Sequence, residues 1–419
     1  MTILISGSGI AGLTLGLTCH QLGFPFKIFE SVEKIKPMGV GINIQPNAVR
    51  ELFDLGFEYD LENIGIKTKE FGTFTKKGLK IWTEPRGKLA GYNWPQYSVH
   101  RGQLQMMLYN RLINLAGKSC VCTGWKVRDF KEINSGISVE VVSENKKEKK
   151  FETGSVLIGA DGIHSRVRKI IYPKEGKPIW NGAVLWRGTS ESKPFRTGAS
   201  MVMIGHASQR VVAYPITQTN KVSGKAIINW ITELKFDPSK GWRKEDWSRK
   251  VNSSEFLPKF KDWKFDWIDI PELINNSEDI FEYPMVDRDP VKKWKKGKSL
   301  LIGDAAHPTY PVGSNGASQA IIDARKIGLN FINYGINEKA LEKFEMENIK
   351  QANNLILANR KSGPDAILQL VEDICGGQFA NISDIISEEK LSIHAENYKK
   401  TAGFSIKELN SSKSILEGY

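Results

Sequence analysis

The chain has 419 residues, of which 40% are hydrophobic and 25% charged, as is typical of a soluble globular protein with a substantial core. Its formal charge of +12 is accompanied by no recognised nucleic-acid motif, and no stretch reaches the roughly 18 uninterrupted apolar residues of a membrane span. We therefore expect neither nucleic acid nor membrane as a partner. Four scattered cysteines form no CxxC pair, which disfavours a zinc site or a disulfide scaffold and favours a cytoplasmic location.

The first part of the chain alternates short apolar runs with amphipathic segments, which indicates parallel strands joined by helices. The predicted elements are strands at 3–6 and 26–29, an apolar strand stopped by a turn over 156–162, helices at 10–22, 46–55 and 102–116, and a β-meander over 120–154.

The segment GSGIAG lies between the first strand and the first helix. Gly7 permits a tight turn, Gly9 lets a pyrophosphate approach the backbone, and Gly12 lets the helix pack close to the strand. Glu30 ends the second strand about 20 residues later, where a carboxylate can accept both ribose hydroxyls. This pattern predicts one bound dinucleotide, FAD or NAD rather than NADP, whose 2′-phosphate Glu30 would repel.

The composition changes after residue 178. Residues 179–283 hold seven of the eleven tryptophans and several β-rich runs, which predicts an inserted sheet with aromatic faces. A short strand then follows at 299–302, and a long helical region is expected over 317–358. The last sixty or so residues also have helical spacing, with four apolar positions predicted to share one face. These positions are Ile367, Leu370, Val371 and Ile374.

Two further turns follow apolar strands. In GADGIHSRVR, Asp161 ends a strand before a short helix, which by itself reads as a β-turn and a capped helix. In GDAAHPTYPVGSNGASQA, Asp304 again follows a strand, and His307 and Ser314 come after it. A hydrolase triad is disfavoured because no GxSxG elbow occurs, and no His/Asp spacing suits a metal.

Together, GSGIAG with Glu30, GADGIHSRVR and GDAAHPTYPVGSNGASQAIIDA resemble, in order and spacing, the three signatures of class A FAD-dependent aromatic monooxygenases. GVGINIQPNAV, YSVHRGQLQ, LWRG, YPMVDRDP and LANRKSGPD are similar to the phenazine hydroxylase branch of that family, and salicylate-type hydroxylases are more distant. The resemblance covers nearly the whole chain.

The resemblance implies a role for each matching position. Gly7, Gly9 and Gly12 would hold the FAD pyrophosphate, Glu30 the ribose, and Arg101 the flavin phosphates. Asp161 would lie near FAD and NAD(P)H, and Asp304 near the ribityl–pyrophosphate part. The catalytic flavin-ring loop would include Pro311 and Gly313, with no acid or base assigned. The complete predicted FAD set is Gly7, Gly9, Ile10, Ala11, Gly12, Glu30, Gly41, Arg101, Asp161, Asp304, Pro311, Gly313, Asn315 and Gly316.

The loop assignment also has a physical basis. A helix that begins near Asn315 would direct its N–H groups toward the negative charge of a reduced flavin, and two prolines would stiffen the loop before it. An aromatic substrate also needs an apolar cleft with a few placed polar groups. Candidates on the inserted sheet are Trp186, Met203, Tyr214 and Trp230, with Arg187 as an anchor for a carboxylate.

The implied reaction is hydroxylation of an aromatic or heteroaromatic small molecule, which could carry a phenazine-like carboxylate. NADH or NADPH and O₂ would be consumed through a flavin C4a-hydroperoxide, and no metal is expected. An FAD-dependent oxidase or dehydrogenase, an epoxidase, and a non-catalytic flavin-binding regulator stay open as alternatives. We expect a monomer or homodimer.

The predicted fold class is α/β, with a Rossmann-like FAD-binding domain of the glutathione-reductase type, an inserted mainly β substrate domain and a C-terminal helical region. The predicted domains are an FAD-binding domain at 1–178 and 284–360, a substrate domain at 179–283 to which 68–98 could contribute, and a helical region at 361–419.

Overall fold

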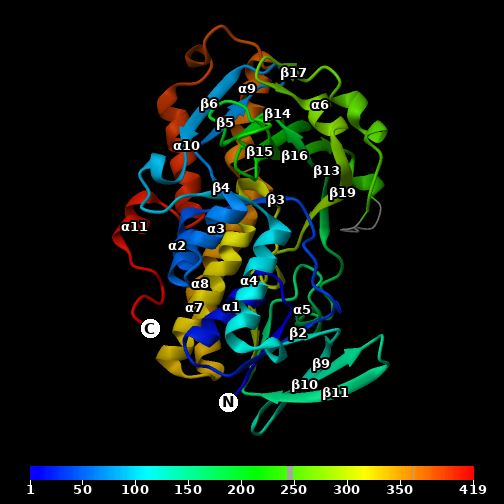
Figure 1. Cartoon of the computed structure of the whole chain (residues 1–419), viewed down its shortest axis with the longest axis vertical. Helices are drawn as coiled ribbons and strands as arrows, with labels where there is room; N and C mark the ends of the chain where they lie inside the picture. Colours follow the sequence, from blue (N-terminus) through cyan, green and yellow to red (C-terminus); the bar gives the residue numbers. More distant parts are fainter. Residues whose placement is uncertain (243–248, 362) are drawn as a thin grey trace.

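The computed structural model describes residues 1–242, 249–361 and 363–419. Residues 243–248, in the predicted insertion at 179–283, lie outside the described residues. Residue 362, in the predicted C-terminal region, does so too. A parallel sheet with helices forms one end of the molecule, and a large mixed sheet forms the other (Figure 1). Among the described helices, none combines the length and apolarity of a membrane span.

The parallel sheet has the strand order β20-β21-β12-β1-β2-β8 in the described part of the chain, and only β20 runs antiparallel. Its central strands β1 and β12 are buried throughout and mainly apolar, because both faces of the sheet are covered. α1, α4 and α7 pack together against it. The bounds are β1 Ile3–Ser6, β2 Phe26–Glu30, β8 Val121–Thr123, β12 Val156–Gly159, β20 Lys295–Lys296, β21 Ser299–Leu301, α1 Ile10–Gln21, α4 Arg101–Ala116 and α7 Gly316–Tyr334.

The large mixed sheet has the order β19-β13-β16-β15-β14-β5-β6 among the described residues. β5 and β6 come from residues 70–85, which are distant in sequence, and β5 pairs parallel with β14. The bounds are β5 Glu70–Phe74, β6 Lys80–Pro85, β13 Ile179–Ser192, β14 Ser200–His206, β15 Gln209–Pro215, β16 Ala226–Lys235 and β19 Ser277–Asp287.

Smaller elements connect and flank these two sheets. The expected β-meander is an antiparallel sheet of β9, β10 and β11. A second small sheet joins β3, β7 and β4, and β17 pairs with β18. The bounds are β3 Gly41–Ile44, β4 Gly65–Lys67, β7 Tyr97–His100, β9 Lys126–Ile133, β10 Gly136–Ser143, β11 Glu148–Gly154, β17 Lys264–Phe265, β18 Ile268–Asp269, α2 Pro46–Asp54, α3 Glu58–Ile64, α5 Arg166–Ile171 and α6 Ile270–Asn275.

The long helical region expected over 317–358 is two helices, α7 and α8 (Glu338–Arg360). The chain leaves α7 at Gly335, whose φ of +80° suits glycine. Asn337 then caps α8, because its side chain accepts hydrogen bonds from the N–H groups of Lys339 and Ala340. The sequence therefore carries both the stop and the start signal.

The C-terminal region is helical, with α9 Ala366–Cys375, α10 Glu388–Thr401 and α11 Ile406–Ser411. The predicted apolar face of α9 is wrong in part. Ile367 and Val371 are buried, but Leu370 and Ile374 are 44% and 54% exposed, whereas Leu368 is buried instead. α9 packs on β14. The side of the helix that faces this strand decides which of its apolar side chains are buried.

Candidate active site

The glycine turn after β1 is shaped by the protein at two positions and left open at a third. Gly7 has a φ of +100°, and a Cβ there would lie 2.6 Å from the carbonyl oxygen of Ala160. A Cβ on Gly12 would lie 2.0 Å from the carbonyl oxygen of Gly7. A Cβ on Gly9, in contrast, would meet no atom of the described chain within 4 Å. Gly7 and Gly12 are therefore needed for packing, whereas Gly9 borders an open space, called the cradle below.

The N-terminus of α1 faces this cradle. Gly9 is its N-cap residue, and Ile10 and Ala11 begin the first turn. In the described structure no side chain caps this helix and its first turn has no acidic residue. The backbone N–H groups and the positive end of the helix dipole are thus directed at the position where a pyrophosphate would bind.

Glu30 lies at the end of β2, beside the turn. Its Oε2 accepts hydrogen bonds from the N–H and hydroxyl of Ser8, at 2.8 and 2.7 Å. Its Oε1 accepts from the Ser31 hydroxyl and the Val32 N–H, both at 3.0 Å. Two of these donors are hydroxyls, which can rotate to other partners, so the carboxylate can accept from the hydroxyls of a ribose.

α4 supplies two side chains near the same turn. Arg101 begins the helix and is exposed, and its charge influences both Asp304 and Arg187. One turn later, Gln105 donates a 2.9 Å hydrogen bond to the carbonyl oxygen of Ser8. The sequence analysis missed Gln105, although its spacing of four residues from Arg101 places both on one side of a helix.

Asp161 is a structural cap that also borders the turn. Its carboxylate accepts hydrogen bonds from the Ser165 hydroxyl and from the N–H groups of Arg166, at 2.8 Å, and Val167, at 3.3 Å. Burial raises the pKa of Asp161, and these hydrogen bonds oppose the shift. A Cβ on Gly7 would lie 2.9 Å from the Asp161 Cα, so the backbone here forms the wall behind the glycine turn.

Arg168, in the segment GADGIHSRVR, contacts the segment that begins GDAAHP. The sequence did not predict this contact. Its guanidinium is almost wholly buried and donates to the carbonyl oxygens of Ala305 and Ala306, at 3.0 and 2.7 Å. Glu175 pairs with it at 2.9 Å from Nε. Arg168 on α5 therefore holds the backbone immediately after Asp304 in place.

Asp304 and His307 have different surroundings. Asp304 is exposed to solvent, although desolvation by the surrounding protein atoms acts on its carboxylate. The partial loss of hydration raises its pKa, and the charges of His307 and Arg101 oppose this. His307 is buried, and its Nε2 lies 2.6 Å from Asp323 Oδ2. Burial alone would lower the pKa of His307, but its contact with Asp323 raises it on balance, so this carboxylate is the internal partner of the imidazole.

The loop from Pro311 to Asn315 leads into α7. Pro311 is exposed, Gly313 has a φ of +71°, and Asn315 is buried at the N-cap of the helix. A Cβ on Gly316 would lie 3.9 Å from Asp304 Oδ1, so the loop and the carboxylate are neighbours. As at α1, no described side chain caps α7 and its first turn has no acidic residue.

The predicted substrate residues divide between the two faces of the large sheet. Trp186 and Trp230 are buried in an aromatic core on one face, where Trp186 stacks on Phe256 with ring centroids 4.8 Å apart. The structure does not bring them to the flavin loop. Met203 and Tyr214 lie on the other face, which also carries Arg187. Strand neighbours alternate between faces, so 186 and 187 must separate.

The face with Arg187 is directed at the flavin loop. Leu185 and Tyr283 on this face pack with Tyr310 and Val312 of the loop. Arg187 therefore lies on the face of the large mixed sheet that packs against this loop.

Arg187 is a cation without a carboxylate partner among the described residues. Its Nη2 donates to the carbonyl oxygen of Gly41 at 3.2 Å, and its side chain is hydrogen-bonded to Tyr214. Its guanidinium carbon lies 5.8 Å from the centroid of the Tyr283 ring. Burial lowers the pKa of Arg187, Tyr214 and Tyr283 oppose this shift, and the like charge of Arg101 adds to it. Asn229, which the sequence did not identify as a candidate site residue, accepts a 2.7 Å hydrogen bond from the Gly41 N–H.

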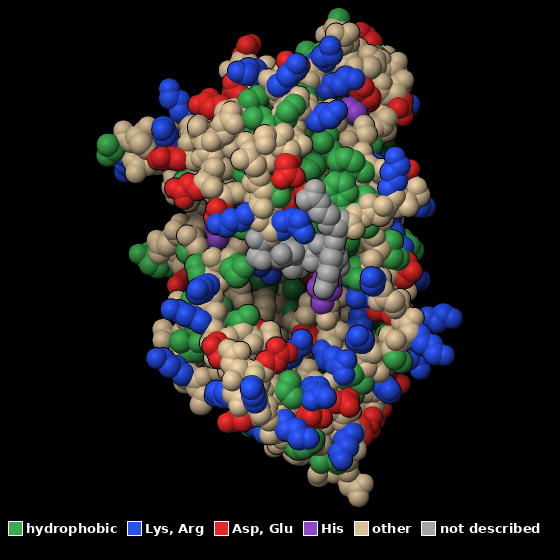
Figure 2. Space-filling view, turned by 90° about the vertical axis from the view of Figure 1, so that its right-hand side faces the viewer, with side chains coloured by type: hydrophobic (Ala, Val, Ile, Leu, Met, Phe, Trp, Pro, Cys, Tyr) green, Lys and Arg blue, Asp and Glu red, His purple; other side chains and the backbone are tan. Residues whose placement is uncertain are grey.

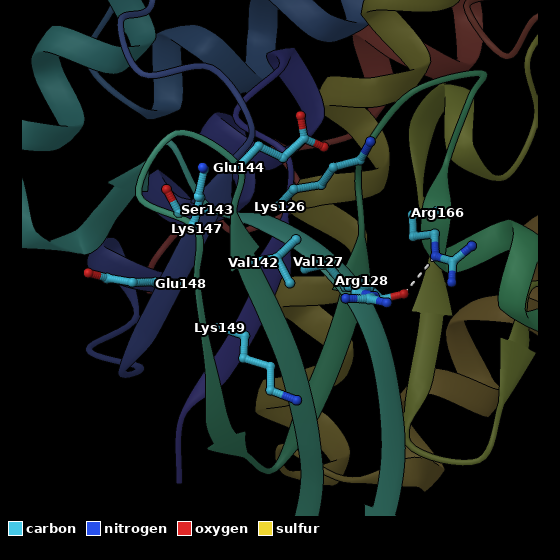
Figure 3. A pocket seen from close by; sticks show the side chains of 10 residues that line it. All are labelled: Lys126, Val127, Arg128, Val142, Ser143, Glu144, Lys147, Glu148, Lys149 and Arg166. Carbon is cyan, nitrogen blue, oxygen red and sulfur yellow. Dashed lines mark hydrogen bonds between the residues drawn. The ribbon is translucent and has the colours of Figure 1, made fainter.

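One face of the molecule has a hollow between its two halves (Figure 2). A separate surface cavity of about 560 Å³ lies on the β9–β11 sheet, where Arg166 donates to the carbonyl oxygen of Arg128 at 2.6 Å (Figure 3). Its lining is mainly charged, which does not suit an aromatic ring. In the described ranges no group of three or more His, Cys, Asp or Glu side chains is arranged to hold a metal ion.

Comparisons with known proteins identify the family of this chain. The family model described as FAD binding domain matches residues 1–343. The chain is 39% identical to phenazine 1,6-dicarboxylic acid hydroxylase PhzS from Lysobacter antibioticus. The match spans 362 residues and covers 85% of this chain and 89% of that protein. It is 29% identical to aurachin C monooxygenase/isomerase from Stigmatella aurantiaca, over 87% of this chain and 89% of that protein.

Solved structures share the fold. HpxO from Klebsiella pneumoniae, complexed with FAD and uric acid, has a TM-score of 0.73 at 20% identity and covers 99% of this chain and 97% of its own. A salicylate hydroxylase substrate complex has a TM-score of 0.71 at 19% identity and covers 97% of this chain and 98% of its own.

Proposed function

Because the chain belongs to the family of FAD-dependent aromatic monooxygenases, we propose that its substrate is a planar heteroaromatic acid whose carboxylate pairs with Arg187. Bound FAD supplies the redox chemistry by which NAD(P)H and O₂ add an oxygen atom to an aromatic ring. The name of the relative PhzS, a phenazine dicarboxylic acid hydroxylase, supports a carboxylated ring.

The residues of this chain would bind and orient FAD. The proposed arrangement has the pyrophosphate in the cradle at Gly9, a ribose at Glu30, and Arg101 and Asp304 along the cofactor. The loop from Pro311 to Gly316 would face the flavin ring. The open cradle, together with the uncapped N-termini of α1 and α7, supports it.

The observation that carries the substrate proposal is the unpaired cation at Arg187. A cation removed from bulk water is costly unless it is paired, and Gly41 and Tyr214 offer it only neutral acceptors. A substrate carboxylate would supply the missing charge and fix the ring orientation. Tyr283 and Met203 would contribute apolar surface on the same sheet face.

Replacing Arg187 tests this assignment. We expect Arg187→Gln to raise KM for phenazine-1-carboxylate about 10- to 100-fold, because a hydrogen bond to a charged group contributes roughly 1.5–3 kcal/mol. KM for uncarboxylated phenazine or a hydroxyphenazine should change less than about 3-fold. Substrate-stimulated NAD(P)H oxidation and product formation give the values. An equal loss with both substrate types would refute the carboxylate assignment, and no oxygenated product from any aromatic compound would refute the hydroxylase function.

The cellular setting is part of the proposal. All four cysteines are unpaired, which is typical of a cytoplasmic protein. We propose a monomer or homodimer that acts on small molecules without nucleic acid.

A further inference from the structure

Tyr398 on α10 reaches across the molecule to the loop before α7. Its hydroxyl oxygen accepts a 2.7 Å hydrogen bond from Asn315 Nδ2. The same hydroxyl lies 3.2 Å from the carbonyl oxygen of Val312 and 3.1 Å from Asn359 Oδ1, two acceptors for its single proton. Burial raises the pKa of Tyr398, so the hydroxyl keeps this proton throughout the neutral range.

The loop adopts a backbone shape that needs such support. Gly313 has a φ of +71° and Ser314 a φ of +54°, and the second is uncommon for a residue with a side chain. The contacts of Tyr398 with Val312 and Asn315 lie on both sides of this pair. A Cβ on Gly313 would lie 1.8 Å from the Tyr398 hydroxyl oxygen, so the ring fits directly against the loop.

Asn359 on α8 completes the attachment. Its Nδ2 donates to the Thr309 hydroxyl at 2.9 Å and lies 3.5 Å from the carbonyl oxygen of Tyr310. Its Oδ1 is the second acceptor for Tyr398. The loop is therefore held at both ends by side chains from helices that follow it in the chain.

We propose that Tyr398 is a positioning residue for the cofactor, whose hydroxyl holds residues 311–315 in the shape that bound FAD requires. The proposal rests on FAD binding by this chain and not on the identity of the substrate. Tyr398 and Asn359 both lie beyond residues 1–343, the part that matches the FAD-binding family model. Tyr398, in the C-terminal helical region, would thus support a cofactor site whose other residues lie in the predicted FAD-binding domain.

The test is Tyr398→Phe, which removes one oxygen atom and keeps the ring. We expect the Kd of the apoprotein for FAD to rise about 5- to 20-fold, with a shift in the visible bands and midpoint potential of the bound flavin. Asn397→Ala, an exposed position on the same helix, is the matched control and should change neither quantity.

A second variant separates positioning from general stability. Asn359→Ala should shift the flavin spectrum in the same direction, and the double variant should show less than the sum of the two effects, because the side chains share one network. If Tyr398→Phe only lowers the thermal midpoint, while FAD affinity, spectrum and potential match the control, the proposal is wrong.

Discussion

At the residue scale, the three glycines of the first turn have different physical reasons to be glycine. Gly7 and Gly12 have no room for a side chain within the protein, whereas Gly9 borders open space. The sequence pattern assigned the pyrophosphate to this turn, but it could not show which glycine serves packing, because that depends on Ala160, far along the chain.

This difference predicts opposite outcomes for two alanine variants. Gly9→Ala should leave the thermal midpoint of the apoprotein within about 1 °C, because its φ of −71° suits any residue, but it should weaken FAD binding at least about tenfold. Gly12→Ala should destabilise the apoprotein itself. Thermal unfolding with and without FAD measures both. Equal apoprotein midpoints for the two variants would contradict the packing role of Gly12.

At the element scale, the C-terminal helices are attached to the large sheet by a buried ionic cluster. Arg210 on β15 pairs with Glu233 on β16 at 2.8 Å and with Asp365, just before α9, at 2.8 Å. All three side chains are at most 10% exposed. Burial raises the pKa of Asp365 to about 6; Arg210 opposes this shift and Glu233 adds to it.

This pKa predicts the pH dependence of stability. The folded pKa of Asp365 is higher than its usual value of 3.8, so the folded state binds the proton more tightly than the unfolded state. Its contribution to the free energy of unfolding is full below about pH 4 and is lost as pH rises through 6, by about 2–3 kcal/mol. The stability of Asp365→Asn relative to the unsubstituted protein should therefore increase between pH 4 and 7. A difference independent of pH in urea unfolding would contradict the raised pKa.

At the scale of the whole molecule, the chain end returns to the N-terminal half. The Ile415 N–H donates to Glu51 on α2 at 3.1 Å, and the Ser414 hydroxyl donates to Asp54 at 2.9 Å. Arg325 on α7, fully buried, contacts the same two carboxylates. Leu416 is also fully buried. The tail thus covers a charged network that links α2 with α7.

Deleting residues 412–419 should lower the thermal midpoint by about 2–5 °C, because it exposes this network and loses the buried Leu416 side chain, worth roughly 1.5–3 kcal/mol. Deleting only 418–419, which includes the exposed Tyr419, is the control and should change the midpoint by less than about 1 °C. Differential scanning calorimetry compares the two. Equal midpoints would show that the tail contributes nothing to stability.

The sequence by itself determined the fold class, the family and FAD as cofactor, and all three are confirmed. These depend on local patterns, because a buried parallel strand is apolar throughout and a phosphate turn needs glycine at fixed spacing. The individual cofactor and substrate residues stay proposals.

Only the tertiary structure decided which face of the large sheet turns toward the flavin loop, and that Tyr398 reaches this loop from α10. Around Leu185, β13 has apolar residues on both faces, so the alternation that separates Trp186 from Arg187 does not show which of the two faces the loop. Tyr398 and Asn315 are far apart in sequence, and no local pattern encodes a contact between α10 and a loop 83 residues earlier.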